Sequence, residues 1–516
     1  MRRLLCTALL LLCCAYGCIA AVVQPLPKRG QGPWDTYTLS VPGVDTDVPE
    51  KVEENWQPIR FAVSSHGVAW TVNHCLYRKV GARWSYGYNN PHFDKVVCYR
   101  RDGITVEKAN LFLNKILPAA ISLHTERLKV KRVSGNLMIS RSTGVFLGKM
   151  CKGVGIPAAH LEEGIPDADF VLYVGIAIYK PATTVCSYNA EERPTSASIK
   201  FRPRDIVDTR HFTRIVAHEI GHGLGFNNRL MNSKEMLTLV TGGSYGVQYE
   251  FRSTLMEKMV RDHYGCHNAT GIRLENDAQH YYYPHWDRRI AKDELMSPYS
   301  GSSNGMFYTA LTLAVFESTG HYKANFSRAE NMSWGRNAGC DFLDKKCRDD
   351  NMSKYSGMFC NLKSTEELQC TSDRFALGKC SKTWKSDALK WQHCLFNERD
   401  GPKMAELDDE CPIIKPLVRT SCETGNADIM PGSIVSNTSR CLSRVEFVSD
   451  SEVRSIGDIC AQVKCDGGKV HIRYKGNNSW HVCDNETEND VISPQSNDSA
   501  LSSGVILCPK YSEVCM

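Results

Sequence analysis

The distribution of cysteine constrains this chain more than any other feature of its sequence. Fourteen of the 23 cysteines lie in residues 340–516, whereas residues 52–339 hold only five. Cytosolic proteins keep their thiols reduced, so this many cysteines without a repeated metal-binding spacing predict a disulfide-bonded protein of an oxidising compartment. The sharp rise near residue 340 predicts a separate C-terminal domain, residues 341–516, built mostly of strands and loops and stapled by disulfides.

The N-terminus has the pattern of a secretory signal peptide. Two arginines follow the initiating methionine, an apolar run covers residues 4–15, and small residues come next. The run is too short to span the ~30 Å of a bilayer's hydrocarbon core, which favours a cleaved signal over a membrane anchor. We expect a signal peptide over residues 1–20, cut after Gly17 or Ala20, and a pro-segment or extended arm over residues 21–55.

Three further features agree with a secreted or extracellular protein. Eight Asn-x-Ser/Thr sequons occur, seven of them after residue 320, which predicts a glycoprotein. No later segment is apolar and long enough to cross a bilayer, so we expect no transmembrane segment in the mature chain. The last residues are polar, and we find no lipid-anchor signal among them.

Composition narrows the class of protein. Hydrophobic residues make up 42% of the chain and charged residues 23%, which is ordinary for a globular protein and excludes a disordered or collagen-like chain. The formal net charge of +5 is small for 516 residues. A nucleic-acid-binding protein usually concentrates basic residues on one face, so we expect no nucleic-acid partner.

Hydrophobic patterning predicts a mixed unit of helices and strands in the first half of the chain. We expect a short strand at residues 59–63, a buried apolar strand at 170–179 and another strand at 196–201. Apolar residues recur at helical spacing from Ile104 to about Val130. Pro118 is expected to bend that helix, because proline cannot donate a backbone hydrogen bond.

The strongest chemical signal is the run His218-Glu219-Ile220-Gly221-His222, which has the pattern His-Glu-x-x-His. On a helix, residues four apart lie on one face, so both imidazoles can reach one metal ion. Neutral imidazole suits Zn²⁺. Glu219 is then directed beside the metal, where it can accept a proton from a metal-bound water.

The residues around this motif agree with a helix. Asp205 or Asp208 is expected to cap its start, and apolar residues such as Val216 and Leu224 mark one face. Gly225 occupies the position where a chain leaves a helix through a left-handed residue.

The third metal ligand is not fixed by the motif. A catalytic zinc needs three protein ligands and one open position for water. The extended form of the motif places another histidine three residues after the glycine, but that position here is Asn228. The ligand must therefore come from farther along the chain, and the candidates are His263, His267, His280, His285, Glu235 and Glu250.

Met296 stands just before Ser-Pro, in a run that has the pattern of a turn placing a thioether beneath a metal site. On spacing alone, a methionine of the hydrophobic core would be the better interpretation of Met296.

Longer runs of the chain resemble the leishmanolysin family, the surface zinc endopeptidases of kinetoplastid parasites. The resemblance covers nearly the whole chain from about residue 55. Besides the helix motif it includes the runs Leu123–Val130, Asp293–Met296, Tyr308–Thr312 and Trp334–Cys340.

The resemblance carries implications for the fold. It implies that the third zinc ligand is His285, 62 residues beyond the helix motif, and that Met296 is the residue of the Met-turn. It implies an α+β fold, with a metzincin-like catalytic unit of mixed twisted sheet and active-site helix over residues 56–226. A central, mainly helical subdomain over residues 227–340 is expected to carry the third ligand and the Met-turn. The family's sheet offers an edge strand to extended substrates, for which residues 170–179 are the candidate.

The sequence therefore predicts a zinc-dependent endopeptidase that hydrolyses peptide bonds in proteins. One Zn²⁺ per chain would be held by His218, His222 and His285, and Glu219 would assist attack by the zinc-bound water. The expected partners are protein or peptide substrates, and the family's link to cell adhesion adds host or cell-surface proteins. The alternatives are a catalytically weak or inactive adhesin or binding protein on the same fold, and a zinc enzyme that acts on a non-peptide substrate.

The sequence also predicts a free thiol and two disulfide bridges. Removing the four cysteines of the signal region leaves 19, an odd number, so at least one thiol has no partner within the chain. Cys394 lies outside the spacing associated with the family and is our candidate for that thiol. Nearness along the chain suggests the bridges Cys75–Cys98 and Cys151–Cys186.

Overall fold

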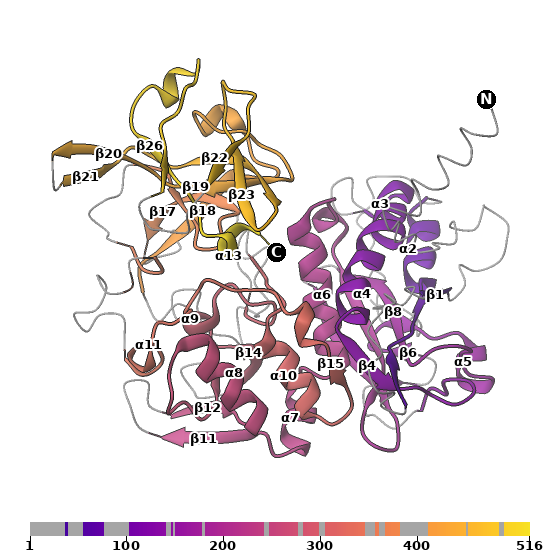
Figure 1. The fold of residues 1–516 in the computed structure, drawn as a ribbon. Helices are drawn as coiled ribbons and strands as arrows, with labels where there is room; N and C mark the ends of the chain where they lie inside the picture. The colour runs from indigo at the N-terminus through magenta and orange to yellow at the C-terminus, as the bar shows by residue number, and fades with distance from the viewer. Residues whose placement is uncertain are drawn as a thin grey trace, which may run out of the picture. The chain divides into compact units, whose positions relative to one another are not determined.

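A computed structural model describes most of the chain after residue 54 (Figure 1). The described residues are 37–39, 55–76, 103–140, 146–147, 150–177, 181–241, 247–276, 282–298, 305–345, 355, 357–360, 367–381, 411–449, 452–483 and 490–515. They fall into two compact units, the first ending at Asp208 and the second beginning at Thr209. The predicted signal peptide, and the pro-segment apart from the short strand Tyr37–Leu39, lie outside the described residues.

A mixed five-stranded sheet forms the centre of the first unit. Its strand order is β1-β3-β8-β10-β9, in which β3, β8 and β10 run parallel and the outer strands β1 and β9 are antiparallel to their neighbours. The strands of this unit are β1 (Tyr37–Leu39), β2 (Trp56–Pro58), β3 (Phe61–Ser64), β4 (Leu128–Lys131), β5 (Phe146–Leu147), β6 (Met150–Cys151), β7 (Val154–Gly155), β8 (Phe170–Ile176), β9 (Ala182–Tyr188) and β10 (Pro194–Phe201).

The predicted substrate strand was wrong. Residues 170–176 form β8, which is hydrogen-bonded on both sides, to β3 and to β10, and so has no free edge. Its side chains are buried from Phe170 to Val174, as expected for a central strand covered on both faces. In the described part of this sheet, β9 lies at one edge and β1 at the other.

The predicted long helix is present but ends earlier than expected. It runs as α3 (Val106–Leu111), a π-helical turn η1 (Phe112–Ile116) and α4 (Leu117–Thr125). The irregular turn directly precedes Pro118, whose ring excludes the regular backbone hydrogen bond to residue 114. Residues 128–131 form β4 instead, paired with β2, because their alternating buried and exposed side chains suit a strand. The other helices of this unit are α2 (His66–Leu76), α5 (Ala158–Glu162) and η2 (Pro203–Asp205).

One predicted disulfide of the first unit is confirmed. Cys151 on β6 is bonded to Cys186 on β9. The other predicted bridge, Cys75–Cys98, and the predicted free thiol of Cys394 involve side chains outside the described part of the chain.

The second unit begins with the helix that carries the His-Glu-x-x-His motif, α6 (Arg210–Leu224). The part up to residue 345 was predicted to be mainly helical, but it also contains a four-stranded antiparallel sheet of order β11-β12-β13-β14. These strands are β11 (Leu237–Thr241), β12 (Val247–Phe251), β13 (Ile272–Asn276) and β14 (Tyr282–Trp286). The further elements are α7 (Asn228–Ser233), α8 (Thr254–Tyr264), α9 (Arg288–Ala291), α10 (Ala310–Ser318), β15 (Lys323–Ala324), η3 (Phe326–Arg328) and α11 (Cys340–Asp344).

The cysteine-rich part after residue 345 consists of short strands and loops, as predicted. Its sheets have the orders β16-β17-β18, β19-β22-β23-β24 and β21-β20-β26-β25. The strands are β16 (Gln369–Cys370), β17 (Ala376–Ser381), β18 (Ile413–Ser421), β19 (Ser439–Leu442), β20 (Arg444–Ser449), β21 (Glu452–Ser455), β22 (Ile459–Asp466), β23 (Lys469–Arg473), β24 (His481–Cys483), β25 (Val491–Ile492) and β26 (Val505–Leu507). Its helices are η5 (Ala427–Ile429), η6 (Ser499–Leu501) and α13 (Tyr511–Val514).

Disulfides connect many of the strands and loops in this part of the chain. Seven bridges join described residues, and five of them lie after residue 345: Cys360–Cys380, Cys370–Cys441, Cys422–Cys460, Cys465–Cys515 and Cys483–Cys508. A further bridge, Cys266–Cys340, ties the end of α8 to the start of α11. The fold is thus α+β, with many small sheets.

Within the described residues, no helix combines the length and the apolar character that crossing a bilayer requires.

Candidate metal centre

The helix α6, which carries the His-Glu-x-x-His motif, has well-defined ends. The side chain of Thr209 caps its start by accepting a hydrogen bond from the amide of Phe212 at 3.1 Å, so the predicted caps Asp205 and Asp208 were wrong. Threonine is a good N-cap, because its hydroxyl satisfies an amide that has no partner in the first turn. At the other end Gly225 has a φ of 133°, a conformation that favours glycine, and this confirms its predicted role.

Three imidazoles meet at one point beside this helix. His218 and His222 lie one turn apart on α6, with their Nε2 atoms 3.0 Å from each other. His285 comes from β14, 63 positions after His222, and its Nε2 lies 3.1 Å from the Nε2 of His222. The ring planes of His218 and His285 are nearly parallel, and both stand almost perpendicular to the ring of His222.

The outer nitrogens of the two helical imidazoles are held by backbone carbonyls. Nδ1 of His218 donates a hydrogen bond to the oxygen of Leu295 at 2.6 Å, and Nδ1 of His222 donates to the oxygen of Phe226 at 2.8 Å. In a neutral imidazole, a protonated Nδ1 leaves Nε2 as an acceptor. The two Nε2 atoms that face each other at 3.0 Å are therefore both acceptors and cannot hydrogen-bond to one another.

The electrostatics keep these rings neutral. Burial, together with the nearby His222, lowers the pKa of His218 well below its usual 6.5. Burial also lowers the pKa of His222 to about 4. Neutral imidazoles with converging lone pairs suit a bound cation. Tetrahedral Zn²⁺ holds nitrogens at roughly 2.0–2.1 Å, which places them about 3.3 Å from one another. The residues present therefore fit a zinc ion.

The predicted turn around Met296 lies directly against this centre. In this turn, the carbonyl oxygen of Leu295 accepts the hydrogen bond from Nδ1 of His218. The carbonyl oxygen of Met296 accepts a hydrogen bond from the amide of Trp286, the neighbour of His285, at 3.1 Å. Met296 is fully buried. The same short turn thus contacts the helix that carries two imidazoles and the strand that carries the third.

The buried carboxylate of Glu294 joins this turn to Thr309 by hydrogen bonds. One oxygen accepts the amide of Met296 at 2.6 Å, and the other accepts the amide and hydroxyl of Thr309 at 3.2 and 3.0 Å. Burial raises the pKa of Glu294 to about 7 in spite of these hydrogen bonds.

Glu219 lies on α6 between the two helical imidazoles, next to His218. Its side chain is buried, with 1% of its surface exposed.

Comparison with known proteins decides the family of this chain. A family model described as "Leishmanolysin" matches residues 16–516. The chain belongs to the leishmanolysin family. It is therefore a leishmanolysin-family metalloendopeptidase, with the histidine triad of His218, His222 and His285 in place.

Individual relatives agree over most of the length. Leishmanolysin of Leishmania major is 30% identical over 482 residues, which cover 89% of this chain and 77% of the relative. The leishmanolysin homolog of Crithidia fasciculata is 30% identical over 488 residues, covering 91% and 72%. The leishmanolysin-like peptidase of Drosophila melanogaster is 24% identical over 536 residues, covering 79% and 78%.

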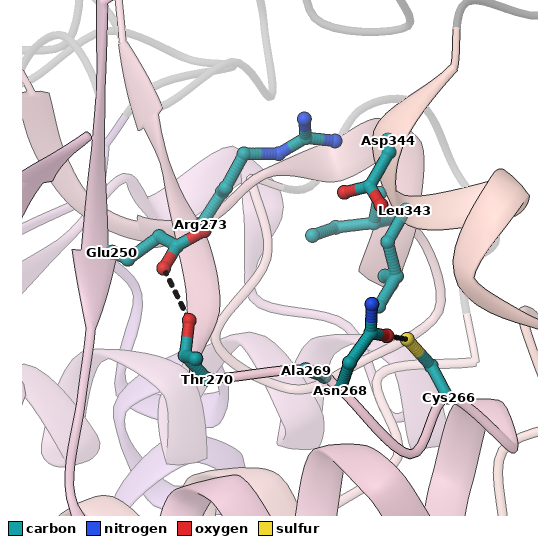
Figure 2. A pocket seen from close by; sticks show the side chains of 10 residues that line it. Glu250, Cys266, Asn268, Ala269, Thr270, Arg273, Leu343 and Asp344 are labelled. Carbon is teal, nitrogen blue, oxygen red and sulfur yellow. Dashed lines mark hydrogen bonds between the residues drawn. The ribbon is translucent and has the colours of Figure 1, made fainter. Parts of the chain in front are cut away.

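In this leishmanolysin-family chain, the other described candidates for the third ligand either bond to other groups or are exposed to solvent. His263 hydrogen-bonds to the oxygen of Trp334 at 2.9 Å, and burial lowers its pKa to about 4. Glu250 pairs with Arg252 at 2.8 Å and lines a small pocket with Thr270 and Arg273 (Figure 2). His267 and Glu235 are exposed, and His280 lies outside the described residues.

Sequence reasoning missed the groups that anchor the helix. Arg214 on α6 makes two hydrogen bonds, of 2.6 and 2.5 Å, to the carboxylate of Glu330, and both side chains are largely buried. Glu330 in turn accepts the amide of Tyr308 at 2.7 Å. The only sequence signal for these residues was an arginine on an otherwise apolar part of the helix.

Proposed function

We propose that this chain is a zinc-dependent endopeptidase that uses Glu219 as its general base. The single observation that carries the proposal is the pair of facing acceptor nitrogens of His218 and His222, 3.0 Å apart and joined by a third from His285. A cation between the nitrogens would stabilise this arrangement, because lone pairs at that distance repel. Three neutral imidazoles are a common ligand set of a catalytic zinc site.

His218, His222 and His285 would hold the ion. When bound there, Zn²⁺ supplies Lewis-acid chemistry: it lowers the pKa of a coordinated water and polarises the carbonyl of the scissile bond. Glu219 would accept a proton from the attacking water at its carboxylate and pass it to the nitrogen of the leaving amine. Because Glu219 is buried on a rigid helix, it needs little reorganisation to act.

The test of the base is the substitution Glu219→Gln, which keeps the size of the side chain and removes its basicity. We expect one zinc per chain to be retained and casein cleavage to fall by about a thousandfold. Glu257→Gln is the matched control, since Glu257 is a partly exposed helical carboxylate paired with Arg261 on α8. Cleavage by the Glu219 variant at the parental rate would reject the assignment.

The third ligand is tested by metal content. We expect His285→Ala to lose zinc, because two imidazoles alone bind it weakly. The control is His263→Ala, which removes a partly buried histidine of the same unit that bonds to Trp334 and should leave the zinc content unchanged. Stoichiometric zinc in the His285 variant would move the ligand elsewhere.

Substrate class and cellular route are part of the proposal. Family membership supports protein substrates. The test is cleavage of denatured casein and its inhibition by a chelator. That result would exclude both an adhesin on the same fold and a zinc enzyme that acts only on a non-peptide substrate. Seven disulfides support passage through the oxidising secretory pathway to a secreted or extracellular location. Recovery of the processed protein with oxidised cysteines from the medium would test that route.

A further inference from the structure

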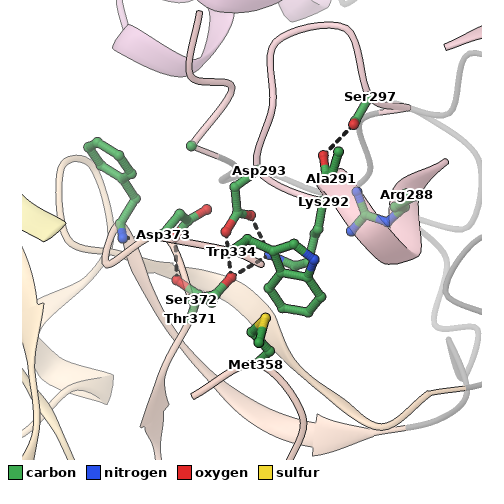
Figure 3. Close-up of polar contacts among 12 residues, drawn as sticks. Arg288, Ala291, Lys292, Asp293, Ser297, Trp334, Met358, Thr371, Ser372 and Asp373 are labelled. Atoms are coloured by element: carbon green, nitrogen blue, oxygen red, sulfur yellow. Dashed lines mark hydrogen bonds and ion pairs between the residues drawn. The ribbon is translucent and has the colours of Figure 1, made fainter. Parts of the chain in front are cut away.

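A polar cluster joins the cysteine-rich part of the chain to the turn beneath the metal centre. It consists of Lys292, Asp293 and Ser372 (Figure 3). Lys292 and Asp293 precede the turn residues Leu295 and Met296, whereas Ser372 belongs to the loop between β16 and β17. We call these three residues the latch.

The latch is a closed ring of hydrogen bonds. The ammonium of Lys292 donates to Oδ1 of Asp293 at 2.6 Å and to the hydroxyl of Ser372 at 2.8 Å. The hydroxyl of Ser372 donates to Oδ2 of Asp293 at 2.6 Å. The side chains of the ion pair are 4% and 1% exposed, so the serine hydroxyl stabilises two charges that water scarcely reaches.

Ser372 itself is firmly placed by the disulfide-bonded fold. Its neighbour Thr371 donates to the carboxylate of Asp373 at 2.6 Å, and the same carboxylate accepts the amide of Phe375 at 3.0 Å. The preceding strand is tied by the bridge Cys370–Cys441. Contacts within the cysteine-rich part therefore help to hold the loop that presents the hydroxyl.

Backbone hydrogen bonds connect the latch to the imidazole of His218. The carbonyl of Asp293 accepts the amide of Phe307 at 2.8 Å, and the amide of Leu295 donates back to the carbonyl of Phe307 at 2.8 Å. The oxygen of Leu295 then holds Nδ1 of His218 at 2.6 Å. A displacement of Asp293 would consequently be passed to the carbonyl that orients His218.

We propose that Ser372 is a positioning residue for the metal centre: its hydroxyl, through Lys292 and Asp293, fixes the turn that orients His218. The inference rests on the proposed zinc site and gives the cysteine-rich part a role in that site. Groups that orient metal ligands from behind affect metal affinity although they never touch the ion. Without the hydroxyl, the ammonium and the carboxylate would each lose a buried hydrogen bond and the pair would rearrange.

The test compares Ser372→Ala with Ser433→Ala in the full-length protein. Ser433 is a buried serine of the same cysteine-rich part that accepts the amide of Cys460 at 3.0 Å and makes no contact with the latch. For Ser372→Ala we expect zinc transfer to a chelator to accelerate about tenfold. We also expect a changed visible spectrum of the Co²⁺-substituted protein, and a lower kcat with an unchanged KM. Ser433→Ala should match the parent in all three.

Two further variants keep the outcome decisive. Ser372→Thr retains a hydroxyl and is expected to restore the parental spectrum and zinc release. If Ser372→Ala does not fold, Asp293→Asn probes the same contact from the other side and should show the same accelerated release. Parental spectra and release rates in the folded Ser372→Ala variant would overturn the inference while leaving the zinc site standing. Absence of zinc from the parent protein itself would instead overturn the proposed function.

Discussion

The Nδ1 atom of His218 lies 2.6 Å from the backbone oxygen of Leu295, a residue 77 positions farther along the chain. This contact joins the active-site helix to the turn around Met296 and determines which imidazole nitrogen is left for a metal ion. The ring of His222 is oriented in the same way by the oxygen of Phe226. Because both acceptors are backbone carbonyls, the orientation of these rings follows the course of the backbone at Leu295 and Phe226.

Removal of the metal is expected to lower the stability of the folded protein. Without a cation, acceptor nitrogens 3.0 and 3.1 Å apart repel each other, and ligand binding to the native state always adds stability. We expect the Tm of chelator-treated protein to fall and to recover on addition of equimolar Zn²⁺. In His285→Ala the chelator should leave the Tm unchanged. A parental Tm that is insensitive to the chelator would contradict the prediction.

The metal-free protein is expected to lose stability on acidification through its buried histidines. The folded pKa of His222 is about 4, below its usual value of 6.5, so between these values the unfolded chain binds a proton that the folded chain does not. The stability contribution is complete above pH 6.5 and is lost as the pH falls toward 4. Denaturant unfolding of the metal-free parent at the two ends of this range should show a larger loss than unfolding of metal-free His222→Gln. Equal losses in the two proteins would speak against a depressed pKa.

Glu294 is expected to give the opposite dependence on pH. Its folded pKa is raised by burial from 4.5 to about 7, so the folded chain keeps a proton that the unfolded chain releases in this range. The stability contribution is present below pH 4.5 and is lost as the pH rises through about 7. Glu294→Gln cannot ionise, so the stability difference between parent and variant should shrink as the pH rises. A difference that stays constant with pH would refute the raised pKa, since the histidine contributions cancel in this comparison.

Breaking the buried pair of Arg214 and Glu330 is expected to be costly. The two side chains are 8% and 10% exposed, so Glu330→Gln leaves a guanidinium in the interior without its counter-charge. We expect the free energy of unfolding to fall by about 3 kcal/mol, measured by urea denaturation. The exposed pair of Lys464 and Asp466 serves as the control, and Asp466→Asn should cost far less, because solvent screens an exposed pair. Similar losses in both variants would mean that the buried pair does not anchor the helix.

The parts of the site that depend on local spacing could be predicted from the sequence. His218 and His222 are one helical turn apart, and Gly225 marks the end of the helix, so a few residues are enough to define their geometry. His285 could not be found in this way, because its position depends on how β14 packs against the helix. Its selection among six candidates needed the resemblance to a family.

Elsewhere the errors have physical causes. The prediction of an edge strand at residues 170–179 is wrong, because an uninterrupted apolar strand is buried on both faces and belongs in the middle of a sheet. The helix predicted to reach Val130 ends at Thr125, because Leu128 and Val130 fit strand alternation as well as helical spacing. The hairpin of β11 and β12 was missed in a region whose neighbouring elements are helical.

The wide separation of His222 and His285 along the chain has a consequence for biosynthesis. Until residue 285 has been synthesised, the proposed site has only two of its three imidazoles, and the carbonyl of Leu295 that orients His218 is made later still. The proposed metal site can therefore be complete only after the chain has been made past Leu295.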